Sequence, residues 1–174
     1  MKSKVTRFDN FLFGLFDRYL YEIAMVFILV ISVVIRMYLT TKAISGDYNC
    51  FLCGWVGEYR AYGVTKGLVV SSSNYYVLYN YILALASVTP WKPYVIISLT
   101  SCMADYIGAY FLYRISLLIL NERDCENAVR KAQMISVACL FLPCILMNGA
   151  LWKQCDSIYT CFLIIALYMC LMEQ

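Results

Sequence analysis

The long apolar runs constrain the fold of this chain more than any other feature. Several are long enough to cross a hydrocarbon core, which takes about 20 mostly apolar helical residues because lipid offers the backbone no hydrogen-bond partner. Of the 174 residues, 63% are hydrophobic and 14% are charged, which is outside the composition of ordinary soluble domains. The sequence therefore predicts an all-α fold: a polytopic helix bundle integral to the lipid bilayer.

The apolar runs predict about four membrane spans, at residues 23–40, 93–118, 132–151 and 157–172. Residues 1–22 have the amphipathic pattern of an interfacial helix, which we place on the cytoplasmic side. Arg36 is the one charge in the first span and lies near its end, so we expect it to snorkel to the headgroups. A cleaved signal peptide is the competing interpretation, although the run is longer than such signals.

The polar segment 41–92 is predicted to lie outside the cytoplasm, within a membrane domain of residues 23–174. It contains a short surface helix ending at Gly63 and an apolar stretch, Tyr75 to Val88, that is too short to span. If that stretch crossed, segment 41–92 and the turn Trp152 to Ser157 would lie on opposite faces. In the four-span topology with a cytoplasmic N-terminus, the cations on the cytoplasmic side roughly obey the positive-inside rule; they are Lys2, Lys4, Arg7, Arg18, Arg123, Arg130 and Lys131.

Composition narrows the chemistry that this chain can perform. The net charge of +3 is small and scattered, which gives no support to a nucleic-acid partner. The absence of histidine removes Ser-His and Cys-His nucleophiles, so any chemistry rests on carboxylates. Most of the nine cysteines lie in apolar runs and are expected to pack as small hydrophobes. Cys50 and Cys53 form a lone CxxC, which favours plain thiols or a local disulfide over zinc.

Two carboxylates lie just beyond the ends of predicted spans. Asp47 follows the first span, and Asp156 precedes the last one. Each fits the role of a helix N-cap, where an aspartate accepts a hydrogen bond from a free backbone N–H. The four-span topology places both on one face of the membrane, which makes a paired function an alternative to capping.

A third carboxylate, Asp105, lies inside the second span, where an ionised group is costly unless it faces protein or water. It shares a helical face of mostly small or polar residues with Ser101 and Gly108. This pattern favours a close-packed helix interface with an interhelical hydrogen bond. A proton or ion relay, typical of a transporter, is the functional alternative.

Four stretches resemble the C-type glycosyltransferase superfamily, the multispanning enzymes that take sugars from polyprenyl-phosphate donors. SGDYNCFLCGW resembles their acidic motif after the first span, and SNYYVLYNYILAL resembles their juxtamembrane helix. YVIISLTSCMADYIGAYFLYRI resembles the second span, and NGALWKQCDSIYTCFLIIALY resembles a WGQxDS-type motif. The layout is most similar to mannosyltransferase-like members. Lys153 replaces the usual glycine of the last motif, and Tyr75 and Tyr76 replace a tyrosine-proline pair.

The resemblance implies transfer of a hexose, with mannose favoured, from a polyprenyl-phosphate-linked donor to an extracytoplasmic glycan or lipid acceptor in a bacterial cell membrane. Asp47 is then the general base, and Asp156 orients the acceptor or binds a divalent cation, Mg or Mn, with Asp47. Donor phosphate and sugar would be bound by residues in or near the matched stretches, namely Arg60, Lys66, Lys153, Gln154, Trp55 and Tyr59. The alternatives are ordinary interfacial cations for the first three and an interfacial aromatic belt for Trp55 and Tyr59.

The resemblance also bears on how much of the enzyme this sequence represents. Such enzymes continue through further spans, so we expect this sequence to be an N-terminal piece, inactive alone, whether by truncation, a fragmentary gene or a split protein. A transporter or flippase component that uses Asp105 is the main alternative function. A non-catalytic membrane subunit is a third.

Overall fold

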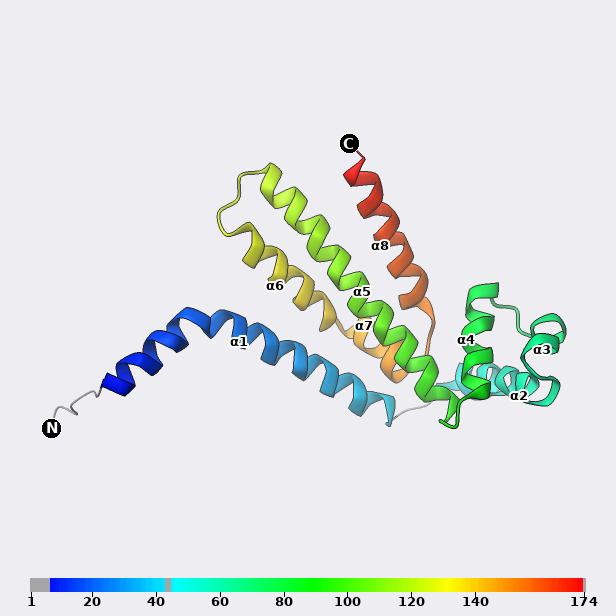
Figure 1. Cartoon of the computed structure of the whole chain (residues 1–174). Helices are drawn as coiled ribbons and strands as arrows, with labels where there is room; N and C mark the ends of the chain where they lie inside the picture. The colour runs from blue at the N-terminus through cyan, green and yellow to red at the C-terminus, as the bar shows by residue number, and fades with distance from the viewer. Residues whose placement is uncertain (1–6, 43–44, 174) are drawn as a thin grey trace.

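The computed structural model of the chain describes residues 7–42 and 45–173, and for residues 7–12 and 16–18 the backbone alone. Every regular element in this part of the chain is helical (Figure 1). In chain order the elements are α1 (Arg7–Thr40), the π-helical turn η1 (Tyr48–Leu52), α2 (Cys53–Tyr62), α3 (Val64–Val70), α4 (Val77–Val88), α5 (Pro93–Glu122), α6 (Ala128–Leu140), α7 (Pro143–Leu146), the π-helical turn η2 (Met147–Leu151) and α8 (Asp156–Met172).

Two of these helices are long and apolar enough to cross a membrane, and a third span results if the bent pair α6 and α7–η2 counts as one. The two are the Tyr19–Thr40 part of α1 and the whole of α5. With 17 residues, α8 stands at the lower limit of span length. The 12 residues of α4 rise only about 18 Å, well short of a hydrocarbon core of about 30 Å, as its short sequence predicts.

The first two predicted elements are a single helix. We predicted an interfacial helix over residues 1–22 and a separate span over 23–40, but α1 runs without a break from Arg7 to Thr40. Residues 1–6 lie outside the described part. Figure 1 shows a bend in the first half of α1, so the change of direction expected between interface and span occurs by bending rather than by a loop.

The span predicted over residues 132–151 is not one straight helix. The chain breaks after α6, and α7 with η2 continues at an angle of 53° to it. Pro143 explains the break, because it occupies the first turn of α7 and its ring cannot continue a preceding helix. The bend turns the chain toward α5 and so places the segment 147–156 beside that helix.

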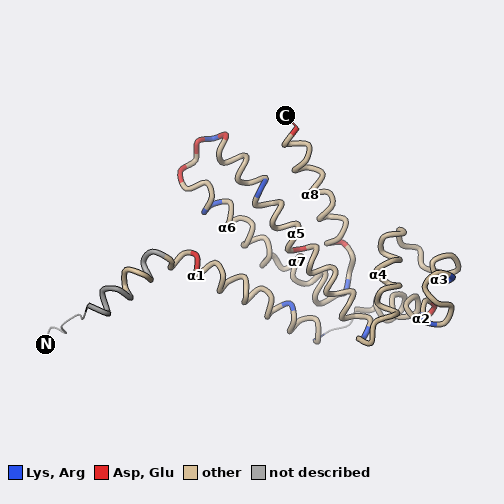
Figure 2. Tube along the Cα trace, in the orientation of Figure 1, with Lys and Arg blue, Asp and Glu red and all other residues tan. Residues whose placement is uncertain are grey.

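The bundle has one end at which most of its helix termini meet. Figure 1 shows α5, α6 and α8 side by side, with α2, α3 and α4 grouped at the end where α5 begins. The C-terminus of α1 contacts η2 and α5 at this same end. The turn between α5 and α6 lies at the opposite end, and Figure 2 shows that charged residues gather there while the helices carry few charges along their length.

The group formed by α2, α3 and α4 has an aromatic core. Tyr48, Trp55, Tyr59 and Tyr79 are all buried there, with Cys155 from the turn before α8 in the same cluster. Gly63 ends α2 with a φ of 78°, a conformation that glycine adopts without strain, as the sequence predicts. This core holds the end of α4 against the start of α5 and so fixes the end of the bundle.

The small and polar face of α5 packs closely against other helices, as the sequence predicts. A Cβ added at Gly149 would lie 2.8 Å from the Cβ of Ser101, so η2 approaches α5 at backbone distance. Ser101 Oγ also donates to the Gln154 carbonyl at 2.7 Å. Gly108 faces Cys161 and Ile164 of α8 at ordinary contact distance. Small residues therefore set the separation of these helices.

Candidate functional site

A group of polar residues, here called the end cluster, lies where the helix termini meet. It contains Asp47, Asn148, Gln154, Asp156 and Tyr159. Gln154 Nε2 donates a short hydrogen bond to Asp47 Oδ2, joining segments 107 residues apart in the sequence. Since Gln154 is two residues before Asp156, this contact brings the two predicted catalytic aspartates to one end of the bundle.

Asp47 does not act as a helix cap. It precedes η1, but its side chain makes no capping hydrogen bond, and Ser45 Oγ accepts from the Tyr48 amide instead. The carboxylate is exposed and held by the Gln154 amide. Capping, which we weighed for this residue, is therefore replaced by a contact with a distant segment.

Asp156 is the first residue of α8 and is held by two neutral donors. Asn148 Nδ2 donates to its Oδ2 at 2.7 Å, and Tyr159, one turn along α8, donates to its Oδ1 at 3.0 Å. Its position in the first turn also suits the positive end of the helix dipole. No side-chain cap bond forms at this terminus. The hydrogen bonds from Asn148 and Tyr159 fix the orientation of both carboxylate oxygens.

Two tyrosines border the end cluster. Burial raises the pKa of Tyr75 to about 12, with further increases from Cys155, Asp47 and Asp156. Burial also raises the pKa of Tyr79, and Cys155 and Asp156 add to it. Because Asp47 and Asp156 both act on the Tyr75 phenol, they lie in one electrostatic neighbourhood. Near neutral pH both phenols remain protonated and can only donate toward carboxylates.

Lys153 is fully buried and serves the backbone. Its ammonium donates to the carbonyls of Ala150 at 2.8 Å, Leu151 at 3.1 Å and Thr40 at 3.1 Å. Burial lowers its pKa to about 8. The φ of 60° at Lys153 is the conformation for which a glycine is ordinarily used. The predicted contact with a donor phosphate is therefore blocked by burial, and the residue ties the end of α1 to the turn before α8.

The other predicted binding residues lie around the aromatic core. Tyr59 is 1% exposed and Trp55 is 8% exposed, so both rings fill the core instead of offering a face to a sugar. Arg60 Nε donates to the Ser87 carbonyl at 3.3 Å and thereby joins α2 to the end of α4. Lys66 lies over the ring of Tyr62 at 5.6 Å. None of these side chains forms an ion pair with a described carboxylate.

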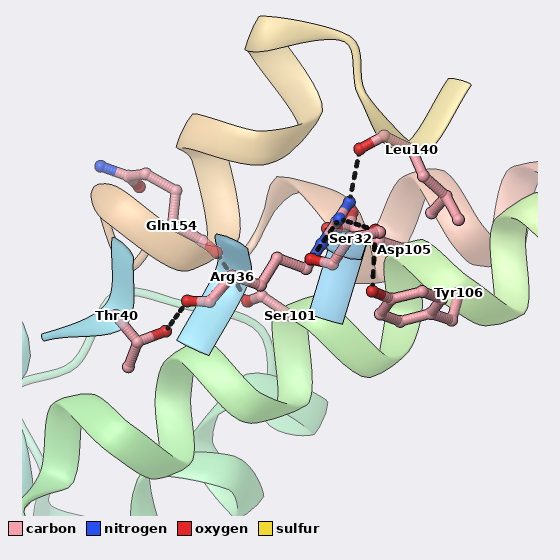
Figure 3. A network of polar contacts seen from close by, with 8 residues as sticks. All are labelled: Ser32, Arg36, Thr40, Ser101, Asp105, Tyr106, Leu140 and Gln154. Carbon is pink, nitrogen blue, oxygen red and sulfur yellow. Dashed lines mark hydrogen bonds and ion pairs between the residues drawn. The ribbon is translucent and has the colours of Figure 1, made fainter. Parts of the chain in front are cut away.

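A second polar group, the mid-bundle cluster, lies deeper and joins α1, α5 and α6 (Figure 3). Arg36 Nε lies 3.5 Å from Asp105 Oδ2, and their side chains are 3% and 4% exposed. Arg36 also donates to Ser32 Oγ at 2.6 Å and to the Leu140 carbonyl at 2.9 Å, and it lies over the Tyr106 ring at 5.0 Å. The predicted snorkelling of Arg36 is wrong, because a buried carboxylate supplies the counter-charge.

A small cavity lies between the two clusters. Its volume is about 170 Å³, and its lining includes Asp105 on one side and Asn148, Asp156 and Ser157 on another. Two buried atoms without a hydrogen bond, Asn148 Oδ1 and Asp105 Oδ2, belong to residues of this lining. The cavity has the volume and polar groups to hold a few water molecules.

The end cluster offers oxygen ligands to a metal but no complete protein site. Within the described residues, no group of three or more His, Cys, Asp or Glu side chains is placed to hold a metal ion. Asp47, Asp156 and the Gln154 carboxamide oxygen are hard donors of the type that Mg²⁺ takes, usually as one or two carboxylates completed by water and substrate phosphate.

Sequence reasoning missed several residues of these clusters. Asn148 and Tyr159 gave no signal beyond lying eight residues before and three after Asp156. The pairing of Arg36 with Asp105 had one, since Arg36 is the only charge in its predicted span and Asp105 is the only carboxylate in the next one. Cys50 and Cys53 are free, exposed thiols, so the alternative of plain thiols holds over the local disulfide.

Comparisons with protein-family models, with curated proteins and with solved structures find no match to this chain. The functional interpretation of the site therefore rests on its own chemistry.

Proposed function

We propose that this chain belongs to a membrane glycosyltransferase that moves a hexose from a polyprenyl-phosphate donor to an acceptor hydroxyl, with Asp47 as the general base. The observation that carries the proposal is the meeting of Asp47 with the Gln154–Asp156 segment at the end of the helix bundle. Two carboxylates at a membrane-proximal end, held by neutral donors, are a suitable base and a suitable orienting group for a hydroxyl acceptor.

The proposed step is a displacement at the anomeric carbon of the donor sugar. The acceptor hydroxyl gives its proton to the Asp47 carboxylate as its oxygen bonds to that carbon. The bond from the carbon to the phosphate oxygen breaks, and the polyprenyl phosphate leaves with the electron pair. A weak base suffices, because the acceptor needs to lose its proton only as the new bond forms.

The neighbours of each carboxylate fit these two roles. Asp47 is exposed and has one described hydrogen-bond partner, which holds Oδ2 and leaves Oδ1 to receive a proton. Asn148 and Tyr159 each donate to one oxygen of Asp156, so the orientation of its carboxylate is fixed. This carboxylate can accept a hydrogen bond from another hydroxyl group of the acceptor molecule. No ion pair with a described cation neutralises either group, which keeps both available as acceptors.

The proposal includes the finer topology. Four spans, formed by α1, α5, the bent α6–α7–η2 segment and α8, place Asp47 and Asp156 together outside the cytoplasm, with the N-terminus inside. The short α4 supports this arrangement, because it lies with α2 and α3 at the end where α5 begins (Figure 1). A bacterial cell membrane, mannose as the sugar, and a glycan or lipid acceptor remain parts of the same hypothesis.

A divalent cation would be held by Asp47 and Asp156 and would neutralise charge on the donor phosphate. Arg60 and Lys66 are the exposed cations of the predicted set at this end of the bundle, and Arg60 is the candidate for a direct contact with that phosphate because its guanidinium can bind in a bidentate way.

The test is sugar transfer in membranes that contain the protein at the full length encoded by its gene, supplied with a polyprenyl-phospho-hexose. Asp47→Asn is expected to lower turnover by about 100-fold or more, the usual contribution of a general base. Glu122→Gln is the matched control, because it removes an exposed carboxylate at the opposite end. Full turnover with Asp47→Asn would remove Asp47 from the mechanism.

A second candidate function is proton or ion transport through Asp105. The observation in its favour is the small cavity that both Asp105 and Asp156 line. The contact of Asp105 with Arg36 favours a structural role instead. If the protein is a transporter, Asp105→Asn is expected to abolish ion flux into proteoliposomes, while Asp47→Asn leaves the flux unchanged. If it is a transferase, neither the unmodified protein nor these variants carry an ion flux.

A further inference from the structure

An apolar groove runs between α1 and α5 on the outside of the bundle. Its volume is about 340 Å³, and its walls are formed by Val33, Arg36, Met37, Thr40, Thr41, Val95, Leu99, Cys102, Met103 and Tyr106. From Val33 to Thr41 it extends about 12 Å along α1, at the helical rise of 1.5 Å per residue. Arg36 lines it but is already engaged with Asp105 and Ser32.

The walls of this groove are open to whatever surrounds the bundle. Met37 is 66% exposed, Met103 is 55% exposed and Leu99 is 47% exposed. Only 11% of the apolar window of α1 is buried within the chain. In a bilayer such a surface is covered by hydrocarbon, so the groove has the depth and polarity to take a lipid chain.

Two exposed lysines adjoin, in the sequence, the lining residues at one end of the groove. Lys42 directly follows Thr41, the last lining residue of α1, and Lys92 precedes α5 one turn before Val95. Both lysines are exposed, and neither forms an ion pair with a described carboxylate. Lys42 lies 4.6 Å from the Tyr38 ring and Lys92 lies 6.0 Å from the Tyr94 ring, contacts that leave their ammonium groups open to water.

The contacts of Tyr94 and Lys153 bring the segment that carries Lys92 close to the segment that carries Lys42. Lys153 lies 5.8 Å from the Tyr94 ring, which Lys92 also faces. The same Lys153 donates to the carbonyl of Thr40, two residues before Lys42. The start of α5 and the end of α1 therefore meet around Lys153, and Lys92 and Lys42 belong to these two segments.

From these observations we infer that the α1–α5 groove is a binding site for an anionic phospholipid of the surrounding bilayer. One acyl chain lies along Met37, Leu99 and Met103, and the phosphate group lies between Lys42 and Lys92. Cations next to one end of an apolar groove match a headgroup with net negative charge, which a zwitterionic lipid lacks. The site is separate from the end cluster and does not depend on the proposed transferase.

The test uses the whole protein in nanodiscs of equal parts phosphatidylglycerol and phosphatidylcholine. A benzophenone amino acid replaces Met103 in the groove, or Met169, which is 53% exposed on α8 away from it, as the control. The lipid adducts formed on illumination are identified by mass spectrometry. The expected ratio of phosphatidylglycerol to phosphatidylcholine adducts is higher at position 103, by about five-fold per lysine, since each adds about 1 kcal/mol near an anionic headgroup.

The variant Lys42→Gln/Lys92→Gln is expected to lower the ratio at position 103 to that at position 169. Adducts at position 169 and the thermal midpoint report on folding of the variant, so a loss at position 103 alone is specific. Equal ratios at the two positions in the unmodified protein would overturn the inference. A ratio at position 103 that survives loss of both lysines would overturn it as well, as would adducts to protein in place of lipid.

Discussion

The end cluster and the mid-bundle cluster both contain a buried or half-buried carboxylate, but the partners that stabilise the negative charge differ between them. Asp105 is paired with a cation, Arg36, and both side chains are buried. Asp156 is held by an amide and a phenol, and Asp47 by an amide, with no described cation paired to either. A carboxylate neutralised by a cation fixes helices to one another, whereas a carboxylate held by neutral donors remains able to accept a proton.

The largest expected effect comes from removing one half of the buried pair. Arg36→Met and Asp105→Leu are each expected to lower the free energy of unfolding by about 3–5 kcal/mol, because the remaining charge is left buried and unpaired. The double variant is expected to cost less than either single one. Thermal midpoints in one detergent measure all three. Additive losses in the double variant would show that the pair does not interact.

The second prediction concerns Lys153, which lies between the clusters. Burial holds its folded pKa at about 8, below its ordinary value of 10.5. Between those pH values the unfolded chain binds the proton and the folded chain has released it, so this group makes stability rise with pH across that window. The gain is at most about 3 kcal/mol, and Lys153→Met is expected to remove it.

Unfolding followed by fluorescence from pH 7 to pH 10 measures this dependence in both proteins. An identical slope in the protein with and without Lys153→Met would contradict the burial of this ammonium.

The third prediction concerns the close approach of η2 to α5. Gly149→Ala places a methyl group 2.8 Å from Ser101 Cβ and 3.4 Å from its carbonyl carbon, so helices must shift. The expected loss is about 1–3 kcal/mol. Gly54→Ala is the matched control, because an added Cβ meets nothing within 4 Å there. Equal thermal midpoints for the two variants would contradict the packing of η2 on α5.

The smallest expected effects are on the orientation of Asp156. Asn148→Ala is expected to lower sugar transfer about ten-fold, and Tyr159→Phe about three-fold, by removing single hydrogen bonds worth about 1 kcal/mol. Tyr113→Phe, on α5 toward the opposite end, is the control. The effects should fall on kcat more than on KM. Unchanged transfer by both variants would leave Asp156 without an orienting role.

The sequence predicts the elements of this fold better than their connections. Apolar length locates α5 and α8 within a few residues, and Pro93 marks the start of α5. The joining of the interfacial segment and the span into α1 was not predicted, because a bent helix and two helices joined by a loop have the same apolar pattern. The break at Pro143 was visible as a proline, but the apolar run around it suggested one continuous span.

In the candidate site, too, some residues could be identified from the sequence, whereas the roles of others depend on packing. Asp47 and Asp156 were identifiable because aspartates beside span ends are chemically conspicuous. The roles of Lys153 and Arg36 were not, because a cation near the end of an apolar run can reach headgroups or turn inward, and only tertiary packing decides between them. Trp55 and Tyr59 fill the core for a similar reason: an aromatic stripe does not reveal which of its sides is covered.

The most direct test of the shared site is whether Asp47 and Gln154 touch in a membrane. In a protein whose native cysteines are replaced by serine, Asp47→Cys and Gln154→Cys are joined by a short methanethiosulfonate cross-linker, and a protease then cuts an engineered site between α5 and α6. The prediction is that the two fragments stay linked, while Asp47→Cys with Lys131→Cys at the opposite end separates. Separation of the Asp47–Gln154 pair would contradict the site and the transferase proposed on it.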